Sequence, residues 1–150
     1  MNRIYKTFRF AYETKYWIDW LIKQCNANLQ EEINNGKLDS LGDEIARTYA
    51  AAISFNVTNG SIVDAAIKRA KILTTGQWDA LAKEAETQKN HIHCTNTMDV
   101  TPTLYILQET CDDIENLQSK LRRGSKRGPL KAYIIKLAVY NLYKEMNNEN

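Results

Sequence analysis

The residues of this 150-residue chain that most clearly suggest chemistry are cations near its C-terminus. Between Asn116 and Lys144 the sequence contains no aspartate or glutamate. A helix that begins after a basic turn adds unpaired N–H groups and a positive dipole end. The arrangement predicts a surface that binds an acidic protein or the phosphates of a nucleic acid. The candidate binding residues are Lys120, Arg122, Arg123, Lys126, Arg127 and Lys131.

Two simpler interpretations of the same cations stay open. Charged residues between two helices can serve only to keep the turn hydrated. Arg122 and Arg123 also lie at the C-terminal end of a predicted helix, where cations stabilise the helix dipole. No glycine-rich phosphate loop accompanies the cluster, so the pattern predicts the charge of a ligand and not its identity.

Residue types that bind metals gather in the segment 90–101, which lacks helical periodicity. It contains His91, His93 and Cys94, followed by Asp99. A zinc site needs a second pair of ligands at matching spacing, and the sequence has none. The pattern therefore favours a plain loop, and we expect neither a metal nor another cofactor.

Three carboxylates, Glu109, Asp112 and Asp113, could act as paired acid and base groups. Nothing in the sequence places an acceptor opposite them. There is also no nucleophile elbow, nucleotide loop or paired metal motif. The sequence thus favours a binding protein over an enzyme, although small helical enzymes can assemble sites from scattered residues.

Aromatic residues gather at the N-terminus, where seven of the fourteen lie within the first twenty positions. Such residues usually close a core or form a dimer interface. Because Arg3, Lys6 and Arg9 are interleaved with them, stacking on nucleic-acid bases is a further interpretation. The candidate interface residues are Tyr5, Phe8, Phe10, Tyr12, Tyr16 and Trp17.

Apolar residues recur every three or four positions through most of the chain, which predicts an all-α fold. Ser61, Thr75 and Thr101 are the expected caps of the third, fourth and fifth helices. Residues 1–12 are an extended arm or an earlier helical turn, and residues 147–150 a disordered tail. The six predicted helices cover residues 13–34, 40–55, 61–73, 75–89, 101–123 and 129–146.

The last predicted helix is the expected centre of this bundle. It begins at Pro129, whose fixed φ suits a first helical residue, and it is apolar on two adjacent faces. A helix of this kind is normally enclosed by its neighbours. We therefore predict a single domain with a C-terminal helical hairpin, its last helix buried and its basic turn exposed.

Composition sets broad limits on the function. Apolar residues make up 43 % and charged residues 25 %, as in ordinary globular proteins. A net charge of +2 is too small for a protein that binds nucleic acid over its whole surface. Three widely spaced cysteines predict free thiols. Without a membrane-length apolar run or a signal peptide, we expect a cytoplasmic protein that does not contact membranes.

The C-terminal residues also carry a resemblance. Gly128-Pro129-x-Lys131, followed by Lys136-Leu-Ala and Leu142-Tyr-Lys, resembles the tail of small uncharacterised proteins of phages and mobile gene cassettes. The resemblance covers about twenty residues. It implies a mobile-element setting and transfers no site residue.

Two functional hypotheses follow. The first is a non-enzymatic protein that binds an acidic protein or nucleic acid through the basic turn at residues 120–131. The second is a self-associating structural module, a homodimer with the aromatic N-terminal residues at its interface.

Overall fold

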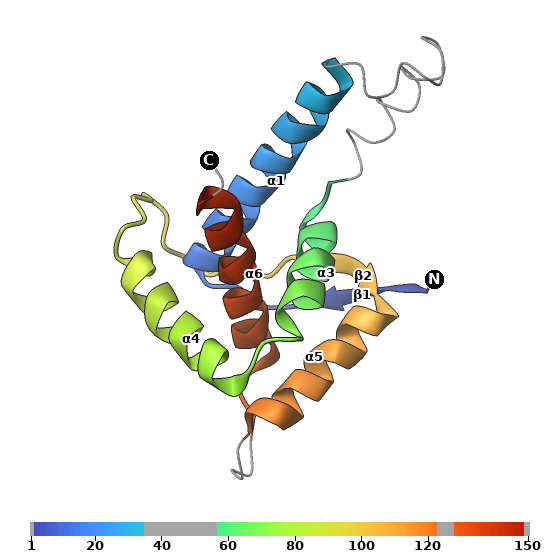
Figure 1. The fold of residues 1–150 in the computed structure, drawn as a ribbon, viewed down its shortest axis with the longest axis vertical. Coiled ribbons are helices and arrows are strands. Elements are labelled where there is room, and N and C mark those ends of the chain that lie inside the picture. Colours follow the sequence, from blue (N-terminus) through green and yellow to red (C-terminus); the bar gives the residue numbers. More distant parts are fainter. Residues whose placement is uncertain (1, 35–56, 123–127, 149–150) are drawn as a thin grey trace.

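The computed structural model describes residues 2–34, 57–122 and 128–148 (Figure 1). These residues form five helices and a small two-stranded sheet, so the fold is mostly helical but the all-α prediction is wrong in detail. The predicted helix at residues 40–55 lies outside the described residues. The elements are β1 (Arg3–Thr7), α1 (Tyr12–Asn34), α3 (Asn59–Ala70), α4 (Thr75–Lys89), β2 (Thr103–Leu107), α5 (Gln108–Leu121) and α6 (Lys131–Asn148).

Helix α6 is the centre of the fold, as its apolar circumference predicts. It packs against α1, α3, α4 and α5, and eight of its residues between Ile134 and Leu142 are buried. In Figure 1 it runs through the middle of the molecule, between α4 and α3. It continues to Asn148, so the first half of the predicted disordered tail is helical. Among the described residues, no helix combines the length and apolar composition that a membrane span needs.

The sheet corrects the prediction that a helix begins at Thr101. Residues Thr103–Leu107 form β2, which pairs antiparallel with β1, and α5 begins only at Gln108. Leu104 and Ile106 are buried while Tyr105 between them is exposed, which is the two-residue period of a strand. The N-terminal arm is therefore a strand, and its partner lies about one hundred positions further along the chain.

Three further helix starts differ from the prediction. Helix α6 begins at Lys131, two residues after the predicted start at Pro129. Thr58, and not Ser61, is the N-cap of α3: its Oγ1 accepts from the Ser61 N–H at 3.1 Å. Thr74, and not Thr75, caps α4 in a capping box with Gln77. In that box the two residues satisfy each other's free backbone N–H groups, which Thr75 could not do from one position further on.

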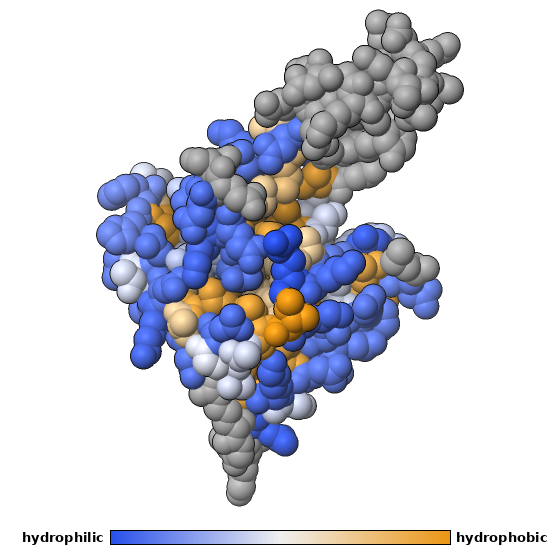
Figure 2. Space-filling model, in the orientation of Figure 1, coloured by the Kyte–Doolittle hydropathy of each residue, from blue (hydrophilic) through white to orange (hydrophobic). Residues whose placement is uncertain are grey.

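Apolar surface remains exposed on the face shown in Figure 2. It lies between hydrophilic regions in the lower half of the molecule, where the turn between α3 and α4 approaches α5 and α6. Ile72 in this turn is 81 % exposed and Leu73 is partly buried.

Candidate functional site

The base of the α5–α6 hairpin is held by contacts between its two sides. The Gln118 side-chain amide donates to the Pro129 carbonyl at 2.9 Å. A Cβ at Gly128 would lie 2.4 Å from the Gln118 carbonyl oxygen, so only glycine permits this approach. The end of α5 and the start of α6 are therefore fixed side by side at one end of the molecule (Figure 1).

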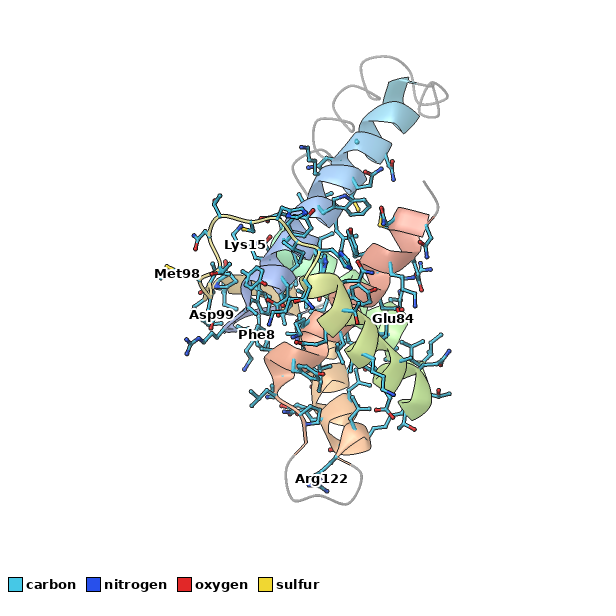
Figure 3. The ribbon with its side chains drawn as sticks, turned by 90° about the vertical axis from the view of Figure 1, so that its left-hand side faces the viewer. Phe8, Lys15, Glu84, Met98, Asp99 and Arg122 are labelled. Carbon is cyan, nitrogen blue, oxygen red and sulfur yellow. The ribbon has the colours of Figure 1, made fainter. Side chains whose placement is uncertain are left out.

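Three of the six candidate binding cations belong to the described residues. Arg122 is exposed at the end of α5 (Figure 3) and forms no ion pair within the part of the chain that the structure describes. Lys120 donates to the Leu73 carbonyl at 2.6 Å, which ties α5 to the turn after α3. The other three candidates, Arg123, Lys126 and Arg127, lie outside the described residues.

The third described cation, Lys131, has a carboxylate partner. Its ammonium lies 3.6 Å from Glu115 Oε1, and both side chains are largely exposed. An exposed pair of this kind contributes little free energy, about 0–1 kcal/mol. Lys131 can therefore exchange Glu115 for a carboxylate of a partner at small cost.

The two remaining cations of the acid-free span are neutralised by other helices. Lys144 pairs with Glu84 of α4 at 2.8 Å. Lys136 pairs with Glu13 of α1 at 3.3 Å, and Glu13 is only 2 % exposed. The two cations of the acid-free span that lie outside residues 120–131 are thus paired within the chain.

The Glu13–Lys136 pair has a structural role. It joins α1 to α6, and Glu13 stands in the first turn of α1, where a negative charge stabilises the helix dipole. Its second oxygen, Oε2, is buried without a hydrogen-bond partner among the described residues. Removing Lys136 would leave this carboxylate buried and unpaired, which is costly.

An open groove of about 730 Å³ lies between the end of β1 and the start of α6. Its lining combines cations with exposed apolar and aromatic groups, among them Arg9, Leu130, Lys131 and Tyr133. Leu130 is 77 % exposed. Arg9 is already paired with Asp99 at 2.9 Å. The groove can thus accommodate a ligand that carries both carboxylates and apolar groups.

The six candidate interface aromatics separate into core and surface. Phe10 and Trp17 are buried, and Trp17 packs against Tyr140 of α6 with ring centroids 4.9 Å apart. Phe8 and Tyr12 are partly buried. The remaining two, Tyr5 and Tyr16, are exposed, and Tyr5 contacts Tyr105 across the sheet at 4.7 Å. Only part of the aromatic cluster is therefore accessible to a partner.

Asp64 of α3 contacts β1, the end of β2 and the start of α5, a role that the sequence pattern did not predict. As a predicted capping residue it would have served its own helix start; instead its Oδ1 accepts from the Leu107 N–H at 3.1 Å and the Thr110 hydroxyl at 2.6 Å. Its Oδ2 pairs with Arg3 at 2.9 Å. Leu107 is the N-cap of α5 and its side chain makes no cap hydrogen bond. Asp64 of α3 satisfies the Leu107 N–H, which is one of the backbone donors left without a partner at a helix start.

The segment between α4 and β2 is a loop, as predicted. His91, His93 and Cys94 are exposed in it, and Asp99 pairs with Arg9. Within residues 2–34, 57–122 and 128–148, no three histidine, cysteine or acidic side chains are grouped as a metal site would require.

The candidate acid–base carboxylates face a lysine. Lys71 lies 3.4 Å from Asp113 and 3.8 Å from Glu109, and Asp112 accepts from the Gln108 side chain. Burial raises the pKa of the Cys25 and Cys111 thiols, so both are protonated at neutral pH and poorly nucleophilic. This geometry gives the three carboxylates structural partners.

Comparisons with protein-family models, curated proteins and solved structures found no match to this chain.

Proposed function

We propose that this protein is a non-enzymatic binding protein that contacts an acidic partner protein through the α5–α6 hairpin, residues 120–131. The observation that carries the proposal is Arg122, exposed at the hairpin end and without an ion pair in the described part of the chain. The sequence adds Arg123, Lys126 and Arg127 directly after it, with no acidic residue among them. A cluster of this kind steers negatively charged partners toward one end of the molecule.

Exposed apolar residues near the cations favour a protein over a nucleic acid. Leu130 stands beside Lys131 and is 77 % exposed. Ile72 precedes Leu73, whose carbonyl binds Lys120 of α5. Protein interfaces bury such side chains at their centre, whereas contacts to a phosphate backbone are made mainly by polar and charged groups. An acidic surface with an apolar patch is the partner that fits both features.

The three free thiols are consistent with a reducing compartment. Cys25, Cys94 and Cys111 form no disulfide. Thiols persist in reducing compartments, and we propose the cytoplasm as the location of the protein and its partner.

Binding of short fluorescent probes, measured by anisotropy, tests the proposal. We expect a glutamate–leucine peptide to bind more tightly than polyglutamate, and both more tightly than a single-stranded oligonucleotide. The variant R122E/K126E/R127E should lose at least about tenfold in peptide affinity, since each reversal replaces attraction by repulsion. The control K23E/K68E/K83E changes the net charge equally at exposed sites on α1, α3 and α4 and should retain binding.

Each alternative result has a definite meaning. Equal losses in both variants would show that only net charge matters and would contradict a hairpin site. Tighter binding of the oligonucleotide, with a steep decrease in affinity as salt is added, would assign the hairpin to nucleic acid. Absence of binding to every probe at about millimolar concentration would reject the proposal.

A further inference from the structure

The backbone of β1 presents an edge whose hydrogen-bonding groups point away from β2. Phe10 and Val100 exchange both backbone hydrogen bonds, at 2.7 and 2.9 Å. In an antiparallel pair such hydrogen-bonded positions recur at every second residue. The backbone N–H and C=O groups of Ile4 and Lys6 therefore also point toward their partners on β2. The N–H and C=O groups of the alternate residues, Arg3, Tyr5 and Thr7, point away from β2.

As far as the described residues show, this outward edge of β1 is open, whereas the corresponding edge of β2 is closed. No backbone hydrogen bond to Arg3, Tyr5 or Thr7 on this side is found among the described residues, and four of the five residues of β1 are exposed. On β2, by contrast, the Leu107 N–H is bound by Asp64. The Tyr105 carbonyl accepts from Arg3, and a Cβ at Gly60 of α3 would lie 2.4 Å from its oxygen. Within the described part of the chain, the sheet can therefore be extended only past β1.

We propose that β1 pairs antiparallel with β1 of a second copy of this chain, which produces a continuous four-stranded sheet in the order β2-β1-β1-β2. The two-fold axis passes through Tyr5, so that Tyr5 of one copy opposes Tyr5 of the other. Each Arg3 then opposes Thr7 and exchanges backbone hydrogen bonds with it, because both residues carry outward groups. The pairing uses every outward N–H and C=O group of the strand.

The side chains of β1 favour a second copy in this register. Like charges directly opposite each other destabilise a sheet; here Arg3 faces Thr7, and Lys6 faces Ile4. The next symmetric register toward the C-terminus would place Lys6 directly opposite Lys6. Tyr5, which is 72 % exposed, already contacts Tyr105 within one copy. The pairing continues this contact into a row of four tyrosines across the sheet.

The interface is small and should give a weak dimer. Five residues per strand bury much less than the roughly 800 Å² per partner of a standard stable interface. Arg3 and Lys6 are also residue types that limit edge pairing. The inference goes beyond the hairpin proposal and does not depend on it, since the hairpin variant R122E/K126E/R127E should dimerise like the wild type.

Sedimentation equilibrium of the full chain, from about 1 µM to about 1 mM, tests the proposal. We expect reversible monomer–dimer association. Tyr5→Pro removes the central outward N–H, which β2 does not use, and should raise the dimer Kd at least about tenfold. Tyr5→Thr keeps that N–H and the strand propensity and should dimerise within about threefold of the wild type. A monomer at every concentration, or equal loss in both variants, would overturn strand pairing.

Amide hydrogen exchange gives a readout that needs no variant. The Tyr5 and Thr7 amides should become protected as protein concentration rises, whereas the Lys6 amide, bound to β2, should be protected at all concentrations. A dimer without this change would place the interface elsewhere and reject the proposal. Protection that appears only on adding an acidic peptide would assign the edge to a foreign strand and likewise reject pairing between copies.

Discussion

Tyr140 shows how the core of this protein sets the acid–base behaviour of a single residue. The side chain is buried on α6 and packs against Trp17. Burial, with a further contribution from the Glu84 carboxylate, raises the pKa of Tyr140 to about 12. A phenolate in this position would lose hydration and stand near a second negative charge. The hydroxyl therefore remains protonated well above the pH at which an exposed tyrosine ionises.

This shift predicts a loss of stability in alkali. Between about pH 10 and about pH 12 the unfolded chain releases the Tyr140 proton while the folded chain keeps it. The stabilisation is therefore complete below about pH 10 and is lost as the pH rises through the folded pKa, up to about 3 kcal/mol. Urea unfolding at about pH 9 and about pH 11.5 measures it. Tyr140→Phe should show a smaller decrease than the wild type, and parallel curves would contradict the assignment.

The strands mark the limit of what local sequence pattern could predict about the elements. Thr101-Pro102 is a good helix start, and Leu104 and Leu107 fit a helical spacing, so the pattern favoured a helix through this segment. The alternation of Leu104, Tyr105 and Ile106 is too short to decide on its own. It becomes a strand because β1 pairs with it from the far end of the chain. Long-range pairing of this kind leaves no local signal.

Asp64 provides a prediction at the scale of elements, since it links α3 to β1 and to the start of α5. Asp64→Asn keeps the size of the side chain but removes the charge that pairs with Arg3. We expect the free energy of unfolding to fall by about 2 kcal/mol, because the side chain is only 11 % exposed and its partners lose a charged acceptor.

The matched control for Asp64 is Asp19→Asn. Asp19 also pairs with a cation, Lys15, at 2.6 Å, but both side chains are about half exposed and lie on the same helix. The cost should stay below about 1 kcal/mol. Chemical denaturation of both variants decides the point: similar losses would show that Asp64 does not hold these elements together.

At the scale of the whole molecule, the central position of α6 could be predicted but the distribution of charge could not. Because α6 is apolar on most of its circumference, it is stable only when other elements bury it. The cations of the acid-free span have no such constraint within the sequence. Lys136 and Lys144 pair with Glu13 and Glu84 because α1 and α4 pack against α6. The predicted binding surface at residues 120–131 does not include these two lysines, and within it Arg122 has no such partner among the described residues.

One pair of substitutions distinguishes residues that stabilise the fold from residues of the proposed binding surface. Ile135 is completely buried on α6, whereas Leu130, just before the helix, is 77 % exposed. Ile135→Ala should lower the free energy of unfolding by about 3 kcal/mol, since it leaves a cavity in the core. Leu130→Ala should change it by less than about 0.5 kcal/mol and instead weaken binding of the glutamate–leucine peptide. Denaturation and anisotropy on both variants test this. If Leu130→Ala destabilised the chain as much as Ile135→Ala, or left peptide binding unchanged, the exposed end of the hairpin would have to be reassigned from partner binding to the core.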